Sequence, residues 1–340
     1  MKKEYLILAA LIAALCAYLV FHSENKTNYT LPDLPKVSGS DITRLNIDKN
    51  KKTISFTRIG DKWVVSRKKY PADPGKIKSM LKVMETLTLS TLASRGDALT
   101  RYDLDAKHRI EAVAENTSGV LRKIEIGKTA PTYRHTFVKI GNDKNIYYAQ
   151  GDFRSDFDND IDGFRNKKIL SFNGGSIRKI SVEKGKKQEV FFLKKSETEK
   201  KGVSSHKKNQ SNGKIKGAVK PVKIKNTGAE NWESKNGSAF NPKDIKSLVS
   251  RLADFKCTHY TDDDSKDAYK TITPLCTIIL KGKKEMSLSL YTKDKNGNYP
   301  GICSENRYPF LLDSYEGDSI LSKVNTLLGI KKIEKKKNSN

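Results

Sequence analysis

The chain has 340 residues, of which 36% are hydrophobic and 31% charged, so it is long enough for two domains that each bury a core. This composition excludes a chain that is disordered throughout. The formal net charge is +26, with 52 Lys and 13 Arg, and the excess of Lys argues against recognition by planar bidentate contacts, which favour Arg.

The first apolar segment is the uncharged run YLILAALIAALCAYLVF at residues 5–21, which follows Lys2 and Lys3. Its seventeen residues would span about 26 Å as a helix, near the lower limit for a bilayer core. We therefore expect a cytoplasmic N-terminus at 1–4, a single-pass transmembrane anchor at 5–21 in the cytoplasmic (inner) membrane, and the bulk of the chain on the periplasmic or extracytoplasmic side. A cleaved signal peptide is the alternative, although residues 19–22 form a poor cleavage site.

Residues 22–40 contain two Pro and many small polar residues, which predicts a spacer between the bilayer and the folded part. Two amphipathic helices are then expected 168 residues apart, one after Asp73 and Pro74 and one after Asn241 and Pro242. In both cases the side chain before the proline, Asp or Asn, can cap free backbone N–H groups of the helix, and Pro occupies the first helical position. The apolar residues share the spacing i, i+3, i+4, i+7, i+10: Ile77, Met80, Leu81, Met84 and Leu87 in the first helix, and Ile245, Leu248, Val249, Leu252 and Phe255 in the second.

Short alternating runs on both sides of the two helices predict antiparallel strands. Trp63 and Trp232 precede the helices at matching places, and Tyr102 and Tyr269 follow them. The expected fold class is therefore α+β, with two tandem repeats that each combine an antiparallel sheet with one long amphipathic helix. The repeats are expected at 41–172 and 173–328. The strands are expected at 42–47, 53–57, 63–66, 110–114, 121–126, 136–140 and 146–148, and at 177–182, 189–193, 231–233, 276–280, 286–290, 301–303 and 308–312.

A Lys-rich insertion at 195–227 interrupts the second repeat, and a basic tail at 329–340 follows it. Residues 195–225 contain ten Lys and two Glu, and residues 331–340 contain five Lys and one Glu. Both segments are poor in apolar residues and cannot bury enough surface to offset the entropy of ordering, so we expect them to be flexible. A solvated linker and attraction to anionic lipid or cell-wall polymer both remain open, whereas nucleic acid is not an expected partner.

Five stretches carry a resemblance to a known family. They are WVVSRKKYPADPGKIKSMLKVMETL at 63–87, RYDL at 101–104, IEIG at 124–127, IYYA at 146–149 and GFRNKKIL at 163–170. In these stretches the chain resembles the bacterial family called domain of unknown function 4340. The resemblance implies a membrane-anchored extracytoplasmic protein, often encoded beside subunits of an ABC exporter, and it supplies no catalytic residues.

The motifs that suggest chemistry are incomplete. DNDIDG at 158–163 matches the opening of a calcium loop, but position twelve is Ile169 where a bidentate Glu is required. We expect Asp160 or Asp162 to cap a short helical turn there instead. IGKT at 126–129 ends like a phosphate-binding loop, but Arg122 stands where the first Gly is needed.

The His and Cys residues do not form a convincing metal site. His22, His108, His135, His206 and His259 are scattered without metal-ligand spacing. Zinc could be bound by Cys257, Cys276, Cys303 and His259, but these residues are more loosely spaced than in typical zinc sites, so the signal is weak. In an oxidising compartment two of the three Cys could pair, and we favour Cys276 with Cys303 because both fall in predicted strands of one sheet.

Three functions follow from these features. The first is a non-enzymatic binding or scaffold protein that serves an ABC exporter or an envelope complex, because duplication of one unit extends a binding surface. The second is binding of a polyanion or envelope polymer through the Lys-rich insertion. The third and least favoured is an envelope enzyme that acts on glycan with two carboxylates from the clusters 156–162 and 262–264. We expect no catalytic, cofactor or metal-binding residues.

Overall fold

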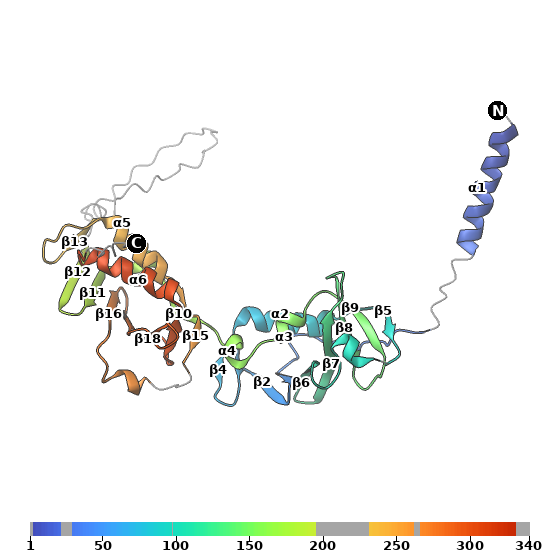
Figure 1. Cartoon of the computed structure of the whole chain (residues 1–340), viewed down its shortest axis with the longest axis horizontal. Helices are drawn as coiled ribbons and strands as arrows, with labels where there is room; N and C mark the ends of the chain where they lie inside the picture. Colours follow the sequence, from blue (N-terminus) through green and yellow to red (C-terminus); the bar gives the residue numbers. More distant parts are fainter. Residues whose placement is uncertain (1–2, 22–28, 97, 195–230, 262–265, 331–340) are drawn as a thin grey trace, which may run out of the picture. The chain divides into compact units, whose positions relative to one another are not determined.

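The computed structural model describes residues 3–21, 29–96, 98–194, 231–261 and 266–330 (Figure 1). These residues form mostly antiparallel sheets with few helices. The chain divides into two compact units, Met1–Asn166 and Lys167–Asn340. The whole of the expected Lys-rich insertion at 195–227, the acidic cluster at 262–264 and the tail from residue 331 onward lie outside the described residues.

The N-terminal helix α1 (Lys3–Phe21) contains the apolar run, but it does not support the expected membrane anchor. Within the described parts of the chain, no helix combines the length and apolar character needed to cross a membrane. The uncharged run has seventeen residues, five of them Ala. Its helical length of about 26 Å is at the lower limit for a hydrocarbon core of about 30 Å, and Ala methyl groups add little apolar surface. The expectation of a transmembrane signal anchor is therefore wrong.

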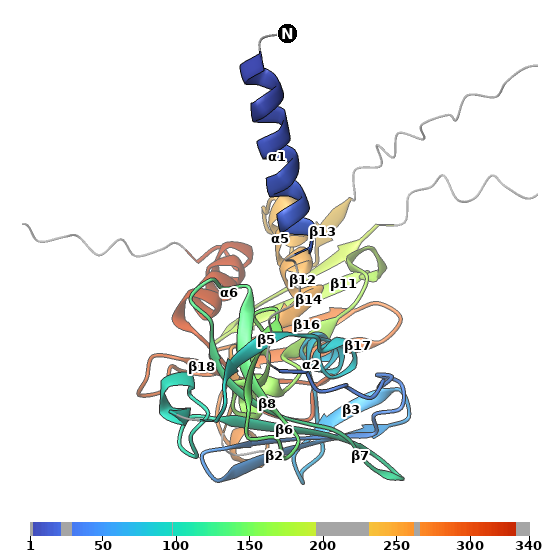
Figure 2. The ribbon, with the colours of Figure 1, turned by 90° about the vertical axis from the view of Figure 1, so that its right-hand side faces the viewer.

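The first unit is built on a nine-stranded antiparallel sheet with the order β4-β3-β2-β1-β6-β7-β8-β9-β5. The strands β6 and β7 run side by side in this sheet (Figure 2). Strands β4 and β5 were not among the expected ones. The bounds are β1 (Arg44–Lys49), β2 (Lys52–Ile59), β3 (Lys62–Val65), β4 (Tyr70–Pro71), β5 (Leu89–Ser94), β6 (Ile110–Asn116), β7 (Gly119–Thr129), β8 (His135–Ile140) and β9 (Ile146–Gln150).

The two faces of this sheet differ because side chains alternate along each strand. On β1, Leu45 and Ile47 are buried, whereas the neighbouring Arg44 is exposed. Arg44 forms an ion pair of 3.4 Å with Glu115 on β6, the strand paired with β1. One face therefore builds the core, and the other carries paired charges that stay in water.

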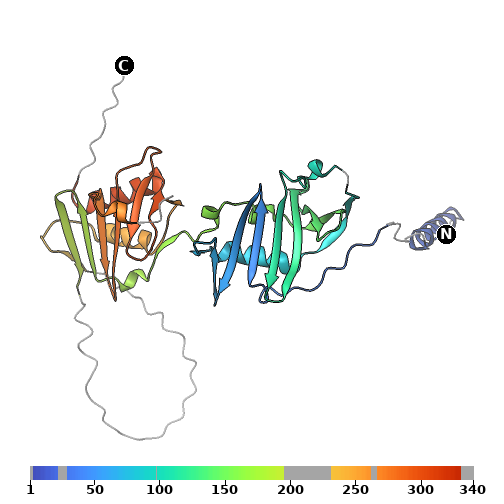
Figure 3. The same cartoon turned by 90° about the horizontal axis from the view of Figure 1, so that it is seen from below.

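The helix α2 (Pro74–Thr86) lies over the apolar face of the sheet (Figure 3). It begins at the predicted place, because the Asp73 side chain accepts hydrogen bonds from the backbone N–H groups of Gly75 at 2.8 Å and Lys76 at 3.1 Å. Pro74 is the first helical residue, as expected. The cap predicted from Asp73 and Pro74 is thus confirmed. The buried side chains of the helix are Ile77, Met80 and Met84.

Short elements complete the first unit. They are η1 (Leu99–Tyr102), α3 (Arg154–Phe157) and α4 (Ile161–Phe164). The ring of Phe164 packs edge-on against the buried Phe56 of β2 with 5.0 Å between ring centroids, which attaches α4 to the sheet. Residues 29–40, the described part of the expected spacer, contain no helix or strand, but Val37 is buried in the unit.

The second unit has an eight-stranded sheet with the order β13-β12-β11-β16-β17-β18-β19-β15. This order repeats that of the first sheet, with no counterpart of β4. The bounds are β11 (Lys179–Lys184), β12 (Lys187–Leu193), β13 (Trp232–Ser234), β15 (His259–Tyr260), β16 (Cys276–Lys281), β17 (Glu285–Leu290), β18 (Tyr299–Cys303) and β19 (Phe310–Leu312). A separate ribbon pairs β10 (Lys168–Ser171) with β14 (Asp254–Lys256), and two turns are η2 (Gly174–Ser176) and η4 (Asp267–Tyr269).

Two helices lie over this second sheet (Figure 3). The expected one, α5 (Pro242–Leu252), is capped by Asn241, whose side chain accepts a hydrogen bond from the N–H of Lys243 at 3.0 Å. The other, α6 (Ser314–Leu327), was not expected. Its signal was present in the sequence, because Asp313 caps the N–H of Glu316 at 2.8 Å and the buried residues follow helical spacing. The expected fold class is therefore wrong: the chain is mostly antiparallel sheet, lacks support for the anchor, and has a second helix in the second unit.

Candidate functional site

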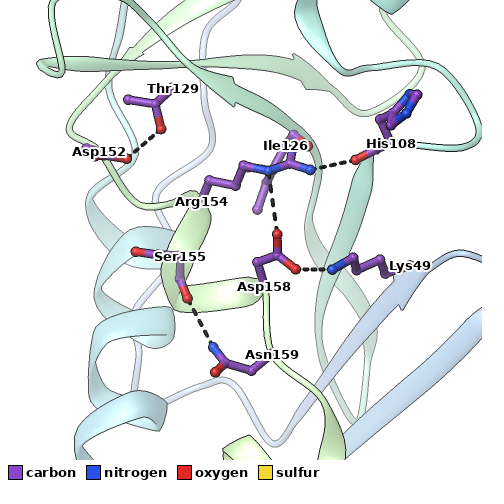
Figure 4. Close-up of polar contacts among 9 residues, drawn as sticks. All are labelled: Lys49, His108, Ile126, Thr129, Asp152, Arg154, Ser155, Asp158 and Asn159. Carbon is purple, nitrogen blue, oxygen red and sulfur yellow. Dashed lines mark hydrogen bonds and ion pairs between the residues drawn. The ribbon is translucent and has the colours of Figure 1, made fainter.

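The acidic segment 156–162 contains carboxylates that already have partners within the first unit (Figure 4). Asp158 forms an ion pair with Lys49 of β1 and lies 3.8 Å from Nε of Arg154 in α3. Arg154 also donates hydrogen bonds to the carbonyl oxygens of Ile126 at 3.1 Å and His108 at 2.7 Å. Asp158 is thus neutralised by two cations, and Arg154 attaches α3 to the sheet.

Asp160 caps α4, because its side chain accepts a hydrogen bond of 2.5 Å from the N–H of Gly163. The predicted capping role is therefore confirmed for Asp160. The neighbouring Asn159 accepts a hydrogen bond of 2.8 Å from the ammonium of Lys76 in α2. In the part of the chain that the structure describes, no group of three or more His, Cys, Asp or Glu is placed to hold a metal ion.

Asp156 lies close enough to Asp152 for the two carboxylates to interact, and a glycan-cleaving enzyme would need a pair of carboxylates. Burial and the nearby Asp152 carboxylate raise the pKa of Asp156, whereas the Lys76 ammonium lowers it. Asp152, however, accepts a hydrogen bond of 2.7 Å from Thr129 (Figure 4), and neither carboxylate lines either of the two hollows described below. A glycosidase places both carboxyl groups around a substrate cleft, so this pair does not build an active site by itself.

The IGKT stretch lies within β7 and is not a loop. A Cβ atom on Gly127 would lie 2.2 Å from the carbonyl oxygen of Tyr102 and 2.9 Å from the side chain of Leu104. Gly127 therefore allows the η1 segment to approach the strand closely. A phosphate-binding loop would instead present its backbone N–H groups to a ligand.

All four cysteines are free thiols, and Cys257, Cys276 and Cys303 are buried. Cys276 lies in β16 and Cys303 in β18, with β17 between them. Adjacent strands are about 4.8 Å apart, so two strands separated by a third are about 10 Å apart, beyond the 4.4–6.8 Å that a disulfide bridges between Cα atoms. The disulfide favoured from the sequence is therefore wrong. Burial raises the pKa of Cys276 to about 11, which keeps this thiol protonated.

None of the described histidines belongs to a group of three or more His, Cys, Asp or Glu that could hold a metal ion. The Nδ1 atom of His108 is 2.8 Å from Asp105, and the His135 ring packs on Tyr148 with 5.8 Å between ring centroids. His259 lies in β15 of the second unit. His22 and His206 lie outside the described residues.

A long groove in the first unit, which we call groove 1, lies between α2 and the β2–β3 hairpin and has a volume of about 880 Å³. Apolar side chains contribute most of its surface, and the half-buried ring of Trp63 lies opposite the helix residues that face the groove. The sequence pattern indicates Trp63 only as a marker of the repeat and carries no signal for groove 1. The apolar lining consists of Trp63, Pro71, Ala72, Pro74, Ile77 and Leu81.

Five exposed charged side chains surround the apolar part of groove 1. Among the described residues, none of the five forms an ion pair or a side-chain hydrogen bond, whereas charges elsewhere on this unit are often paired. Three are cationic and two anionic, so the rim has a small positive excess. They are Asp61, Lys62, Lys78, Lys82 and Glu85.

Both ends of the helical wall are held in place. The Asp73 cap fixes the start of α2. Near its end, the buried guanidinium of Arg122 donates hydrogen bonds to the carbonyl oxygens of Met84 and Pro35. Gly39 closes the groove beside this end, where an added Cβ would lie 3.3 Å from the Glu85 carboxylate. The helical wall of groove 1 is therefore held at both ends, a property that favours binding because little order is lost when a ligand enters.

These features define a class of protein: two units with the same strand order, each with an amphipathic helix over its sheet, and a groove between helix and sheet. The chain belongs to the family described as Domain of unknown function (DUF4340), whose model matches residues 63–274, or 212 of the 340 residues. The resemblance noted from the sequence is thereby confirmed. Comparison with curated proteins and with solved structures found no match.

Proposed function

We propose that the chain is a non-enzymatic binding protein and that groove 1 contacts its ligand. The observation that carries this proposal is the combination of an apolar groove of about 880 Å³ with five rim charges that have no partner among the described residues. Ligand sites in proteins are typically concave, mostly apolar and of about 300–1,000 Å³, with a few polar groups that set orientation.

Trp63 supplies the aromatic anchor of this surface. Large aromatic side chains carry much of the binding energy at interfaces because they bury a wide apolar area at a low entropic cost. The rim charges would then select a ligand of complementary charge and steer its approach. No step of this function needs a nucleophile, an acid–base pair or a cofactor.

The partner class we propose is a protein of an ABC exporter or of an envelope complex. The support for this choice is the family resemblance, since such exporters are often encoded beside members of the family. The extracytoplasmic location belongs to the same proposal and follows from the same resemblance. It requires no transmembrane helix in this chain.

Site-specific photo-crosslinking in cells that carry the full-length chain tests this proposal. A photoreactive amino acid in place of Lys78 is expected to give a covalent adduct with an exporter subunit or an envelope protein. The matched control replaces Lys52, which is exposed on β2 and does not line groove 1. Equal adducts from both positions, or no adduct from position 78, would contradict the proposal. Loss of the adduct in a Trp63→Ala background would link it to the groove.

A further inference from the structure

The second unit contains a smaller hollow, which we call groove 2, with a volume of about 120 Å³. It lies between α5, Trp232 of β13 and the turn formed by Gly174 and Gly175. The positions of these residues in the second unit match the positions of the groove 1 residues in the first unit. Groove 2 is therefore built at the same place in the repeated fold.

The correspondence follows from elements that align in both units. The buried Ile42 and Ile177 each lie two residues before the equivalent strands β1 and β11, and Pro74 and Pro242 each begin the equivalent helices. Six groove positions then match. They are Gly39 and Gly174, Trp63 and Trp232, Ile77 and Ile245, Lys78 and Lys246, Leu81 and Val249, and Lys82 and Ser250.

The glycines show that the matching positions also have matching contacts. A Cβ atom on Gly39 would lie 3.9 Å from Cβ of Leu81, and one on Gly174 would lie 3.2 Å from Cγ1 of Val249. In both units, therefore, the turn before the first strand approaches the same position of the helix. This approach closes one end of each groove.

Trp232 has an unsatisfied donor beside groove 2. Its side chain lines the groove and is only 8% exposed, and its Nε1 atom is buried without a hydrogen-bond partner among the described residues. Buried N–H groups nearly always have an acceptor in native proteins. A ligand carbonyl or carboxylate oxygen in groove 2 would accept a hydrogen bond from this donor once the indole turns its N–H toward the groove.

We infer that both grooves bind the same ligand class, an extended peptide segment in which acidic and apolar residues alternate. The features that the two grooves share are an indole, an aliphatic pair and one exposed Lys, Lys78 or Lys246. An extended peptide offers a backbone carbonyl to the indole, an apolar side chain to the aliphatic pair and a carboxylate to the Lys. This inference rests on the proposed function and adds the ligand class and the second site.

The dimensions and charges of groove 1 favour a peptide over a lipid headgroup. Its lining residues extend from Pro74 to Thr86, the full length of α2. Thirteen helical residues span about 20 Å, the length of about six extended peptide residues. The carboxylates of Asp61 and Glu85 on the rim would repel a phosphate group, whereas a peptide can place uncharged residues beside them. Groove 2, lined along α5 only from Ile245 to Ser250, accommodates a shorter part of such a segment.

Fluorine NMR can observe both grooves in one sample, because the chain contains two Trp residues and each lines one groove. The full-length chain, labelled with 5-fluorotryptophan, is titrated with a hexapeptide of alternating Glu and Leu. The two signals are assigned with Trp63→Phe, a change at a half-buried position that leaves the Trp232 signal. Both signals are expected to shift, and a hexapeptide of alternating Lys and Leu is expected to bind at least about tenfold more weakly.

Matched substitutions separate the two sites. Lys78→Gln is expected to weaken binding about two- to fivefold at Trp63 alone, and Lys246→Gln by the same factor at Trp232 alone. Lys243→Gln changes an exposed residue of α5 that does not line groove 2 and should change neither.

Each remaining outcome overturns a defined part of the inference. A shift of the Trp63 signal alone would remove the second site and leave the proposed function in place. Shifts on addition of phosphatidylglycerol vesicles, without any response to the acidic peptide, would replace the peptide by a lipid. No response of either signal to peptide or vesicle would remove the ligand class and the second site, whereas the proposed function would fall only if crosslinking from position 78 also failed.

Discussion

Gly127 illustrates how a single residue of β7 depends on a distant segment. Its missing side chain leaves room for the backbone of Tyr102, whose carbonyl oxygen would lie 2.2 Å from an added Cβ. In the sequence this glycine belongs to an incomplete phosphate-loop motif, in which Arg122 stands where the first Gly is needed. In the structure, the lack of a side chain at Gly127 allows η1 to pack closely against the sheet.

Gly127→Ala is therefore expected to destabilise the first unit. The new methyl group would force η1 away from β7, and overpacking of this kind typically costs about 1–3 kcal/mol. Gly175→Ala is the control, because a Cβ there would contact only the Asn173 side chain at 3.4 Å. Chemical denaturation followed by circular dichroism measures both variants. Equal stability of Gly127→Ala and the wild type would contradict the assigned packing role.

Glu189 is a buried carboxylate of β12, 5% exposed, that is held by hydroxyl and amide donors. Ser238 and Ser234 donate hydrogen bonds of 2.8 and 2.9 Å, and Asn236 donates one of 3.3 Å. Burial raises the pKa of Glu189, but the hydrogen bonds from Ser238 and Ser234 and from the N–H of Val190 outweigh it, so the net pKa is lowered. The carboxylate thereby organises residues 234–238, which lead into α5.

Glu189→Gln is expected to lower the free energy of unfolding by about 1–3 kcal/mol at neutral pH, because the amide presents a donor to a site built from donors. The pH dependence follows from the lowered pKa in the folded state. The carboxylate stabilises the fold above the unfolded pKa of about 4.3, and this stabilisation is lost as the pH falls through the lower folded pKa. The difference between wild type and variant, measured by urea unfolding at several pH values, should thus shrink on acidification. A difference that does not vary with pH would contradict this role.

At the scale of elements, α2 and α5 show the same design. Each begins with a capping side chain followed by Pro, and each turns an aliphatic stripe toward its sheet. The caps matter for function as well as folding, because these helices form one wall of groove 1 and of groove 2. Loss of a cap would loosen the wall at its first turn.

Asp73→Ala is expected to lower the stability of the first unit by about 0.5–2 kcal/mol, because two backbone N–H groups lose their acceptor. Asp61→Ala is the matched control, since Asp61 is exposed and its side chain has no hydrogen bond among the described residues. Thermal unfolding of both variants tests the difference. The cap would have no energetic role if both melted at the temperature of the wild type.

At the scale of the whole molecule, each unit has a sheet made only of its own strands. The second unit has a contiguous core that includes Ile180, Phe191, Leu248 and Phe310. Such units can in principle fold alone, because each buries its own apolar surface.

A fragment of residues 29–166 is accordingly expected to unfold in one cooperative transition. Far-ultraviolet circular dichroism and fluorescence of Trp63 should report the same denaturation midpoint. Fluorescence of 8-anilinonaphthalene-1-sulfonate serves as the control for a loosely packed state. A broad transition with strong dye binding would mean that this unit needs the rest of the chain.

The amino-acid sequence alone determined the start of α2 and α5, a cap at Asp160 or Asp162, many of the strands and the family. These features depend on interactions within a few residues, such as a side chain that caps the next turn or an alternation that fits a pleated strand. The same local patterns wrongly predicted that the apolar run of α1 is a membrane anchor, because its length and its composition both lie near the minimum for a transmembrane helix. These patterns also missed α6, whose Gly317 lowers helix propensity but makes room for the ring of Tyr299.

Only the tertiary structure decided which distant residues meet. The strand order of the second sheet places β17 between Cys276 and Cys303. The packing of α3 against the first sheet brings Asp158 into ion pairs with Lys49 and Arg154. The grooves likewise arise where a helix, a hairpin and a turn converge, although Trp63 and Trp232 stand out in the sequence. Such contacts depend on strand pairing and helix packing over long separations, which local patterns constrain only weakly.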